Sequence, residues 1–313
     1  METERFQYNR LHLIRPFGAP SPQGEGFSVL SQTEFQIPIY RTAAEPFPNR
    51  KENDMDFKIL AVGDVCGESG LRFLCRRLRG IKKQYGIDFC AVNGENASVV
   101  GLSKHQAETM LDAGADVITL GNHSFGRREI ASFLEDCPYI LRPANLSPLY
   151  PGRGQGVYDT RAGDLAVLNL IGRCGMDFGP DNPFLLTEKL LKTLKTKLIV
   201  ADFHAEATSE KLAFGYAFDG QISAIWGTHT HVPTADSMLL PKGTGYVTDL
   251  GMTGPRFSVL GIRPEQSVAT FRGGLTSRFE TAPGPCKLEA VAFTLDTVSG
   301  LCVGTERITE YED

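Results

Sequence analysis

The sequence predicts one α/β domain built as a four-layer α/β/β/α sandwich, with an irregular extension in front of it. From residue 56 onward, apolar strand-like segments alternate with amphipathic helix-like segments, which is typical of parallel βαβ units. A hairpin-like pattern near residue 160 interrupts this alternation, and the chain beyond residue 245 is rich in strand-like segments. A parallel half followed by a more antiparallel half is therefore expected, without internal repeats.

Residues 1–54 form the extension, and they differ from the rest of the chain. Segment 17–26 is rich in proline, glycine and serine, and a short strand-like patch at 35–40 is interrupted by a proline. These features predict a largely disordered segment. Because Met55 directly precedes the first convincing strand, a native start at Met55 is an alternative, and the folded domain is expected over residues 55–313.

The first half of the domain alternates regularly. Strands are predicted over residues 57–63, 87–92, 116–120 and 139–141, and helices over 69–85, 103–113 and 126–135. The first helix carries apolar residues at helical spacing, at Leu71, Leu74, Leu78 and Ile81. Ser103 stands where a cap for the second helix is expected.

The second half begins with the hairpin and then returns to alternation. The hairpin is predicted over residues 156–160 and 164–170, followed by a loop over 172–186. Helices are predicted over 187–196 and 206–217, and strands over 197–203 and 222–226. The tail beyond residue 245 is predicted as strands, including 246–249 and 287–295.

The composition is that of an ordinary soluble globular protein, with 313 residues, 42% of them hydrophobic and 22% charged. A net charge of −5 predicts attraction neither to duplex nucleic acid nor to a membrane. No apolar stretch approaches the roughly 18 residues of a membrane span, and no export signal is evident at the N-terminus. Seven scattered cysteines without a CxxC motif predict reduced thiols and a cytoplasmic location. The sequence leaves a homo-oligomer open.

Metal-binding residue types follow five of the predicted strands. They are Asp64, Glu95 with Asn96, Asn122 with His123, His204, and His229 with His231. Any one of them alone is more often a helix cap, a turn residue or a satisfied polar side chain. Together they predict a metal site, because loops beyond the carboxyl ends of parallel strands converge on one crevice.

The spacing of two histidines strengthens this prediction. His229 and His231 are separated by one residue, so on an extended backbone they would share one face and bind one metal or two adjacent ones. A carboxylate such as Glu95 can bridge two cations, and a metal pair suits phosphoryl transfer. Two histidines hydrogen-bonded in a core are the structural alternative, at the cost of unusual polarity beside Trp226.

Several motifs, taken in order, resemble one known family. These are 63–64 (Gly-Asp), 93–96 (Asn-Gly-Glu-Asn), 121–123 (Gly-Asn-His), 142–145, 202–211, 227–232 and 248–254. Over about residues 56–309 the chain resembles the calcineurin-type metallophosphoesterases, and within them the bacterial YmdB-like branch. The run over 202–211 is the most specific of these motifs, whereas Gly-Asn-His is shared by the superfamily.

The resemblance implies a site with two metals, iron or manganese. Asp64 and His231 would hold one metal, with Asn96 as a weaker candidate ligand. The other metal would be held by Asn122, His204 and His229, and Glu95 would bridge both. A metal-bridging hydroxide would attack phosphorus, and His123 would act as general acid toward the leaving alkoxide.

Two departures from the superfamily pattern belong to the YmdB-like branch. The first motif usually reads Asp-x-His, but here Cys66 stands in the histidine position, and Glu95 stands in the position of a usual aspartate. Cys66 as a thiolate ligand is an alternative; a small packed residue is the favoured interpretation. Asp202 and Glu206 flank His204 and are candidates for orienting the metal ligands.

The predicted function is hydrolysis of phosphodiesters such as 2′,3′-cyclic nucleotides. Arg142 and Thr253 are candidate substrate-binding residues, and structural roles are the alternative for both. A phosphomonoesterase or protein phosphatase on the same site is a second reading of the function. The third reading is a weakly catalytic regulator that binds a nucleotide through its metals.

Overall fold

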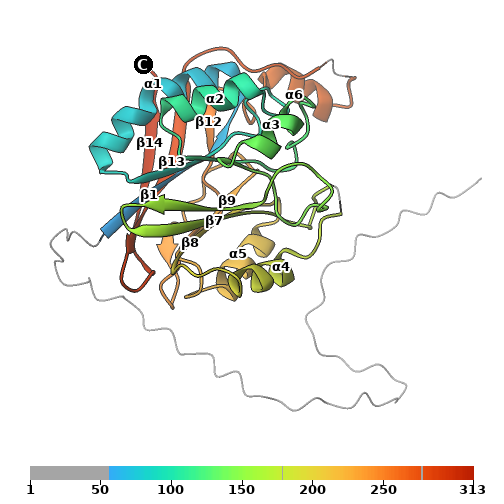
Figure 1. Cartoon of the computed structure of the whole chain (residues 1–313). Helices are drawn as coiled ribbons and strands as arrows, with labels where there is room; N and C mark the ends of the chain where they lie inside the picture. Colours follow the sequence, from blue (N-terminus) through green and yellow to red (C-terminus); the bar gives the residue numbers. More distant parts are fainter. Residues whose placement is uncertain (1–55, 178, 276–277) are drawn as a thin grey trace, which may run out of the picture. The chain divides into compact units, whose positions relative to one another are not determined.

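The computed structural model describes residues 56–177, 179–275 and 278–313, and the predicted extension over 1–54 lies outside the described residues. The described chain forms two sheets that pack face to face with helices on both outer sides, which confirms the predicted α/β/β/α sandwich (Figure 1). No described helix is both long and apolar enough to cross a membrane.

The first sheet has a parallel centre and an antiparallel flank, in the order β2-β12-β13-β1-β3-β4-β5, and β14 also pairs with β13. Parallel pairing joins β1, β3, β4 and β5, as the βαβ pattern predicts. Its strands are β1 (Asp56–Val62), β2 (Asp64–Val65), β3 (Phe89–Asn93), β4 (Val117–Thr119), β5 (Ile140–Leu141), β12 (Met252–Pro255), β13 (Cys286–Asp296) and β14 (Cys302–Tyr311).

The second sheet is parallel through its middle, in the order β10-β11-β9-β8-β7-β6. Only its edge strands β6 and β10 pair antiparallel. The antiparallel character expected of the second half of the chain is therefore divided between the sheets, because β12, β13 and β14 return to the first sheet. The strands are β6 (Gln155–Thr160), β7 (Gly163–Ile171), β8 (Leu198–His204), β9 (Ala224–Thr228), β10 (Met238–Leu239) and β11 (Gly245–Val247).

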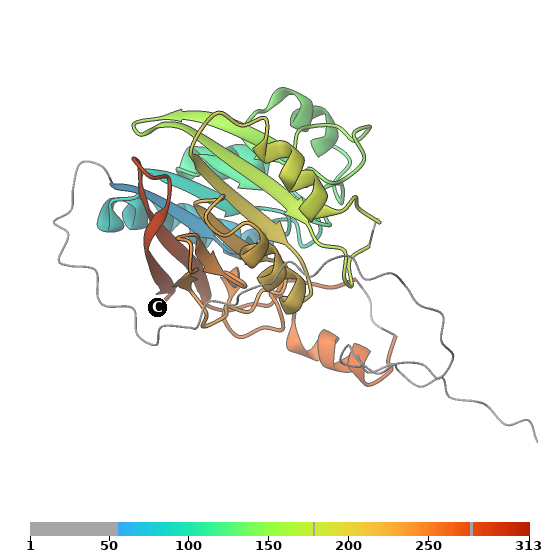
Figure 2. The same cartoon turned by 90° about the horizontal axis from the view of Figure 1, so that it is seen from below.

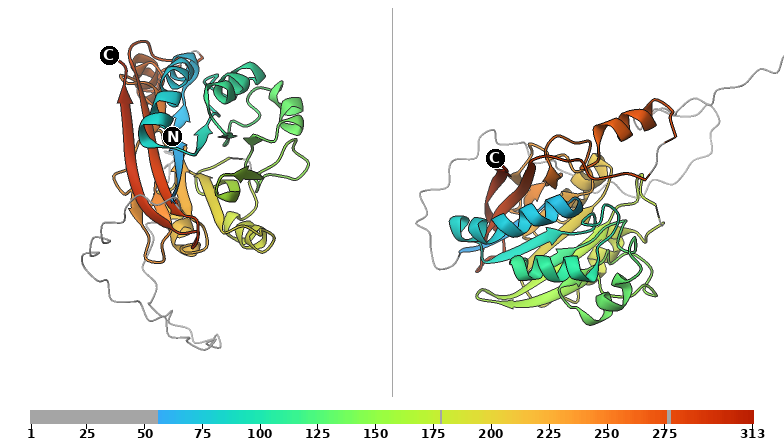
Figure 3. Two further views of the ribbon diagram at one scale, coloured as in Figure 1. Left: turned by 60° about the vertical axis from the view of Figure 1, so that its left-hand side comes forward. Right: turned by 90° about the horizontal axis from the view of Figure 1, so that it is seen from above.

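The helices cover the outer faces of the two sheets. Helices α1 and α2 lie side by side over the first sheet, and α4 and α5 cover the second (Figures 1 and 3). Helix α6 projects from the body of the domain (Figure 2). The bounds are α1 (Gly67–Tyr85), α2 (Lys104–Ala113), α3 (Ile130–Asp136), α4 (Pro183–Leu191), α5 (Thr208–Ala217) and α6 (Pro264–Phe271).

Three apolar clusters hold these layers together. One joins the helices α1 and α2 to the first sheet, one lies between the sheets, and one joins the second sheet to α4 and α5. Between the sheets, the ring of Trp226 stacks on Phe293 with centroids 5.9 Å apart, and both side chains are almost completely buried. The removal of this apolar surface from water stabilises the packing of the two sheets against each other.

Three helices differ from the sequence-based prediction. Helix α3 begins at Ile130, four residues after the predicted start. Helix α4 begins at Pro183, four residues before the predicted start, because the Asn182 side chain accepts hydrogen bonds from the amides of Phe184 and Leu185. Helix α6 was not predicted, since the tail was read as strands only. The Ser103 cap of α2 is confirmed, and it forms a capping box with Gln106.

The fold directs five strand ends toward one place. Strands β1, β3 and β4 of one sheet and β8 and β9 of the other all end at the same edge of the sandwich, where their loops meet. Polar side chains that are far apart in the sequence are thereby brought together.

Candidate metal centre

Glu95 lies at the middle of the site. Its side chain is completely buried in the loop after β3. Oε1 lies 3.2 Å from His204 Nε2, and Oε2 accepts a hydrogen bond of 2.9 Å from the backbone amide of His123. Glu95, His204 and His229 each offer a ligand atom within 4.8 Å of the others, close enough to hold one metal ion.

Asn122 completes the first ligand set. His204 Nε2 lies 2.9 Å from Asn122 Oδ1 and 3.1 Å from His229 Nδ1. The structure thus brings together Glu95, Asn122, His204 and His229, which come from four different loops. They are the four residues predicted to surround one metal.

In the neutral imidazole of His204, which is the form that binds a metal, the neighbours place the proton on Nδ1 and leave none on Nε2. The Thr228 hydroxyl donates to Asp202 Oδ1 at 2.7 Å, so its lone pair accepts from His204 Nδ1 at 2.9 Å. Nε2 is then an acceptor, and it faces the acceptor atoms of Glu95 and Asn122. A cluster of lone pairs without a proton between them is what a cation stabilises, so a metal fits this site.

The other two histidines are oriented in the same way. His229 Nε2 lies 3.2 Å from a Glu206 carboxylate oxygen, which leaves Nδ1 to face His204. His231 Nδ1 lies 3.1 Å from the backbone carbonyl of Leu260 and donates to it, which leaves Nε2 as an acceptor that faces the Asn96 amide and Asp64. Asp202 thus contacts His204 through the Thr228 hydroxyl, whereas Glu206 contacts His229 and not His204.

A second ligand set lies beside the first. Asp64 Oδ1 is 3.6 Å from His231 Nε2. Asp64 is completely buried, and its Oδ1 has no hydrogen-bond partner among the described residues. A buried carboxylate oxygen without a donor is costly, and a cation held between Asp64 and His231 would satisfy it.

The charged groups shift each other's pKa. Burial raises the pKa of Asp64 to about 6. Burial also acts to raise the pKa of Glu95, but His204 and His123 lower it to about 2. Burial and the neighbouring His204 lower the pKa of His229 to about 3, so this imidazole is neutral at pH 7 and available as a ligand.

Asn96 and Cys66 do not point their donor atoms at a metal in this arrangement. Asn96 Oδ1 accepts from His123 Nδ1 at 2.8 Å, while its Nδ2 lies 3.2 Å from Glu95 and 3.1 Å from His231 Nε2. Cys66 Sγ lies 3.4 Å from His231 Nδ1, the ring nitrogen that does not face Asp64, and it donates to the backbone carbonyl of Asp64 at 3.4 Å. The structure thus favours Asn96 as an orienting residue and Cys66 as a small packed residue.

The backbone around the paired histidines is not extended, so the condition under which they would share one face is not met. His229 has a φ of 100° and His231 a φ of 61°, and both lie in the left-handed region. Their rings consequently face different partners, His204 and Asp64. Asp249 holds the turn between them by accepting the Thr230 amide at 3.2 Å, and the buried Lys211 ammonium pairs with Asp249 at 2.7 Å.

Arg142 and Thr253 lie away from the site. The Arg142 guanidinium donates to the carbonyls of Pro143, Tyr150 and Pro151, at 2.8, 3.3 and 3.2 Å, and thereby holds the turn after β5. Thr253 is completely buried in β12. Neither residue lines the cavity described below, so the structure gives both of them structural positions and does not support substrate contact.

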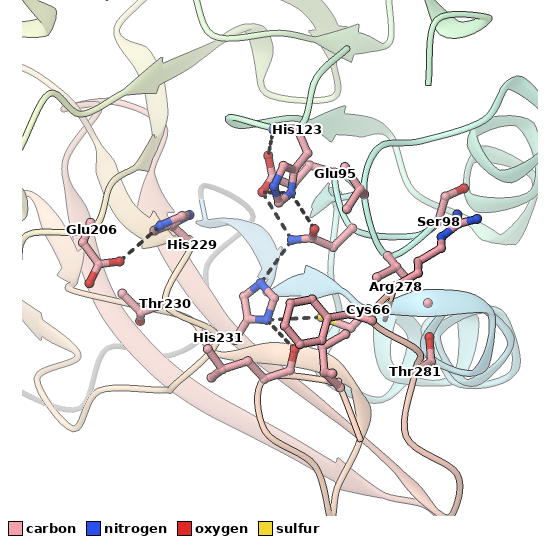
Figure 4. A pocket seen from close by; sticks show the side chains of 18 residues that line it. Cys66, Glu95, Ser98, His123, Glu206, His229, Thr230, His231, Arg278 and Thr281 are labelled. Atoms are coloured by element: carbon pink, nitrogen blue, oxygen red, sulfur yellow. Dashed lines mark hydrogen bonds and ion pairs between the residues drawn. The ribbon is translucent and has the colours of Figure 1, made fainter. Parts of the chain in front are cut away.

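A cavity of about 820 Å³ opens over the metal ligands (Figure 4). Pockets of this size accommodate small organic ligands. The lining residues come from seven separate stretches of the chain, and they are Cys66, Gly67, Glu95, Asn96, Ser98, Val99, Val100, His123, Glu206, His229, Thr230, His231, Leu260, Gly261, Ile262, Arg278, Phe279 and Thr281.

Sequence reasoning missed three parts of this site. Thr228 orients His204, but a threonine at the end of a strand carries no distinguishing signal. The Lys211–Asp249 pair joins two motifs that had been noted only for the resemblance. The residues from 260 onward line the cavity although they lie about thirty positions beyond the last histidine.

Thr228→Val should lower metal affinity about 10- to 100-fold, because it removes the hydroxyl that connects Asp202 to His204. The free energy of unfolding should fall by about 1–3 kcal/mol, since two buried polar groups lose their partner. Metal titration and chemical denaturation measure the two effects. Thr187→Val is the matched control, because the buried Thr187 hydroxyl has no partner among the described residues. Equal effects of the two substitutions would contradict the assigned role of Thr228.

Gly121→Ala should lower activity about 100-fold or more, because the added methyl group would overlap His204 Nε2 and Glu95 Oε2 and displace both. Metal content measured by elemental analysis should fall with it. Gly80→Ala is the control: its methyl group meets nothing within 4 Å in helix α1, and it should stabilise the protein by about 0.5–1 kcal/mol. If Gly121→Ala keeps its full metal content, the methyl group does not displace His204 and Glu95, and the close contact of these side chains with Gly121 is refuted.

Comparison with known proteins agrees with the geometry of the site. The family model described as YmdB-like protein matches residues 60–308. A 2′,3′-cyclic-nucleotide 2′-phosphodiesterase of Bacillus subtilis (strain 168) is 42% identical over 261 residues, a match that covers 82% of this chain and 98% of that protein.

Two solved structures share the fold. The crystal structure of a novel phosphatase from Mycoplasma pneumoniae has a TM-score of 0.78 at 36% identity, covering 82% of this chain and 94% of that one. A hypothetical protein from Thermus thermophilus has a TM-score of 0.77 at 36% identity, covering 82% and 100%. Fold, site and sequence agree, and the chain belongs to the YmdB-like family of metallophosphoesterases.

Proposed function

We propose that the protein is a phosphodiesterase that opens 2′,3′-cyclic nucleotides at a site with two metals. Membership of the family makes it a phosphoric ester hydrolase, and the Bacillus subtilis relative is named for this substrate class. The observation that carries the proposal is the position of Glu95. Its buried Oε1 lies 3.2 Å from His204 Nε2 and 3.2 Å from the Asn96 amide nitrogen, and that amide also contacts His231, so Glu95 is near both ligand sets.

Each ligand set would hold one cation. Asn122, His204 and His229 would hold the first, Asp64 and His231 the second, and Glu95 would lie between them. Imidazole nitrogens mixed with carboxylate and amide oxygens suit iron or manganese, the metals that we propose. When bound, the cations supply Lewis-acid stabilisation of the charge that develops on the phosphoryl oxygens.

His123 is proposed to donate the proton to the leaving alkoxide. Its Nδ1 is held by Asn96 Oδ1 at 2.8 Å, and its backbone amide is held by Glu95 at 2.9 Å. The ring lines the cavity, so Nε2 is the nitrogen that remains for the substrate. Breaking the bond to the 2′-oxygen would release a nucleoside 3′-monophosphate.

The location is proposed to be cytoplasmic. The seven cysteines are all free in the described part of the chain, and Cys66, Cys90, Cys137, Cys286 and Cys302 are buried. Unpaired thiols suit a reducing compartment.

A substrate panel with the purified full chain tests the function. The panel contains 2′,3′-cyclic nucleotides, 3′,5′-cyclic nucleotides and phosphomonoesters, and elemental analysis of the same sample gives the metals. The expected result is fastest hydrolysis of 2′,3′-cyclic nucleotides with two iron or manganese ions per chain. Faster turnover of monoesters would support a phosphatase instead. The absence of any turnover by metal-loaded protein would support a regulator.

A further inference from the structure

The cavity has two chemically different sides. Metal ligands and their neighbours form one side. The other side is formed by six residues from a segment after β12, which we call the C-terminal wall: Leu260, Gly261, Ile262, Arg278, Phe279 and Thr281. Figure 4 shows Arg278 and Thr281 across the pocket from Glu206 and His229. The phosphate and the two proposed cations would occupy the polar side, which leaves the wall for the remainder of the substrate.

The backbone of the C-terminal wall is fixed by hydrogen bonds. Ile262 and Thr281 form an antiparallel bridge. The Gln266 side chain in helix α6 forms hydrogen bonds with the backbone just before and just after Phe279. Its Nε2 donates to the Arg278 carbonyl at 3.1 Å, and its Oε1 accepts from the Glu280 amide at 2.8 Å. The side chains of Arg278 and Phe279 are thereby held at a defined place on the cavity surface.

The wall is also connected to the metal centre. The Leu260 carbonyl accepts the His231 Nδ1 proton at 3.1 Å. Leu260 has a φ of 55°, and the other described non-glycine residues with positive φ are Val99, His229 and His231. All four line this cavity. Strained backbone that is confined to one cavity is typical of a binding site.

Phe279 and Arg278 carry the chemistry of the wall. Phe279 is 42% exposed, so a large part of a side chain that could pack in a core remains open to solvent at the cavity. Arg278 is the only lysine or arginine among the lining residues, and its guanidinium has no hydrogen bond or ion pair to any residue in the described ranges. A free aromatic face beside a free planar donor is suited to a heteroaromatic base.

We propose that Phe279 and Arg278 form the nucleobase subsite, an inference that rests on the proposed function. Phe279 stacks on the base, and Arg278 donates to acceptor atoms on the edge of the base. Stacking is tolerant of sequence because every base has a π-face. The cavity volume of about 820 Å³ leaves room for a nucleoside beyond the phosphate.

The test compares a nucleotide with a substrate that lacks the base. The two substrates are adenosine 2′,3′-cyclic phosphate and methyl ribofuranoside 2,3-cyclic phosphate. Phe279→Ala should lower kcat/KM for the nucleotide about 10- to 100-fold and leave the base-free substrate within about twofold. Arg278→Gln should lower kcat/KM for the nucleotide about 10-fold with the same selectivity.

Phe271→Ala is the matched control. Phe271 lies in the same segment, is 89% exposed and does not line the cavity, so its removal should change neither rate. Equal losses for both substrates in Phe279→Ala, or no loss for either, would overturn the subsite. Equal rates of wild-type protein on the two substrates would also overturn it while leaving the phosphodiesterase function in place.

Adenosine, which carries no phosphate, gives a readout that does not depend on turnover. It should bind to metal-loaded wild-type protein in an NMR titration, and Phe279→Ala should weaken this binding about 10-fold or more. If wild type binds adenosine but hydrolyses no cyclic nucleotide, the proposed function fails and the subsite remains. If adenosine does not bind, the subsite is refuted.

Discussion

Glu95→Gln is expected to abolish activity by removing metal from the protein. The glutamine side chain keeps the size of glutamate but has no negative charge to offer to two cations. The Glu95 carboxylate is completely buried, and its pKa is lowered to about 2, so the surroundings strongly favour its charged form. Metal content should fall from two ions per chain to one or none, and kcat/KM should fall about 100-fold or more.

Elemental analysis and a phosphodiester assay on the same sample measure both effects. Glu108→Gln is the matched control, because Glu108 lies exposed on helix α2 with only a distant ion pair to Lys104, at 3.7 Å. It should change neither metal content nor rate. Two metal ions per chain in Glu95→Gln would show that the carboxylate does not bridge, and the assignment of both ligand sets would have to be revised.

The sequence predicted the composition of this site because of a general property of parallel sheets. Strands β1, β3, β4, β8 and β9 each end in a residue or short run that was identified as a candidate ligand, and their carboxyl ends meet at one edge. The position of Asp64, Glu95, Asn122 and His204 follows from strand order alone. No side-chain geometry is needed to place them within reach of one another.

The conformation of the loops could not be predicted in the same way. His229 and His231 adopt positive φ, which costs roughly 1–3 kcal/mol each for non-glycine residues and is overcome only by the surrounding contacts. One such contact is the Leu260 carbonyl, which comes from a segment that had been read as strand. Local sequence patterns do not contain long-range interactions of this kind.

Arg142 illustrates a different limit. An arginine in a motif of a phosphoesterase suggests neutralisation of the phosphate charge. Here the Arg142 guanidinium instead donates hydrogen bonds to three backbone carbonyls. Arg278, which carries the free guanidinium, lies in a segment with no recognisable motif. Residue type indicates what chemistry is available, whereas the hydrogen-bond partners determine whether it is used.

His123→Ala is expected to lower kcat about 10²- to 10⁴-fold while metal content stays at two ions per chain. His123 differs from the ligands because its ring is held at the edge of the site by Asn96 and remains about one-third exposed. Its removal takes away a proton donor and leaves every proposed ligand in place. His105→Ala, at an exposed position of helix α2, should have no effect on either quantity.

The identity of the leaving group separates proton donation from other roles of His123. A ribose alkoxide is a strong base that needs a proton as the bond to phosphorus breaks, whereas p-nitrophenolate leaves without one. If His123 is the general acid, His123→Ala should slow the cyclic nucleotide by the full amount and slow a p-nitrophenyl phosphodiester far less. Equal losses on both substrates would mean that the ring stabilises the phosphoryl group or the loop, because neither of those roles depends on how basic the departing oxygen is.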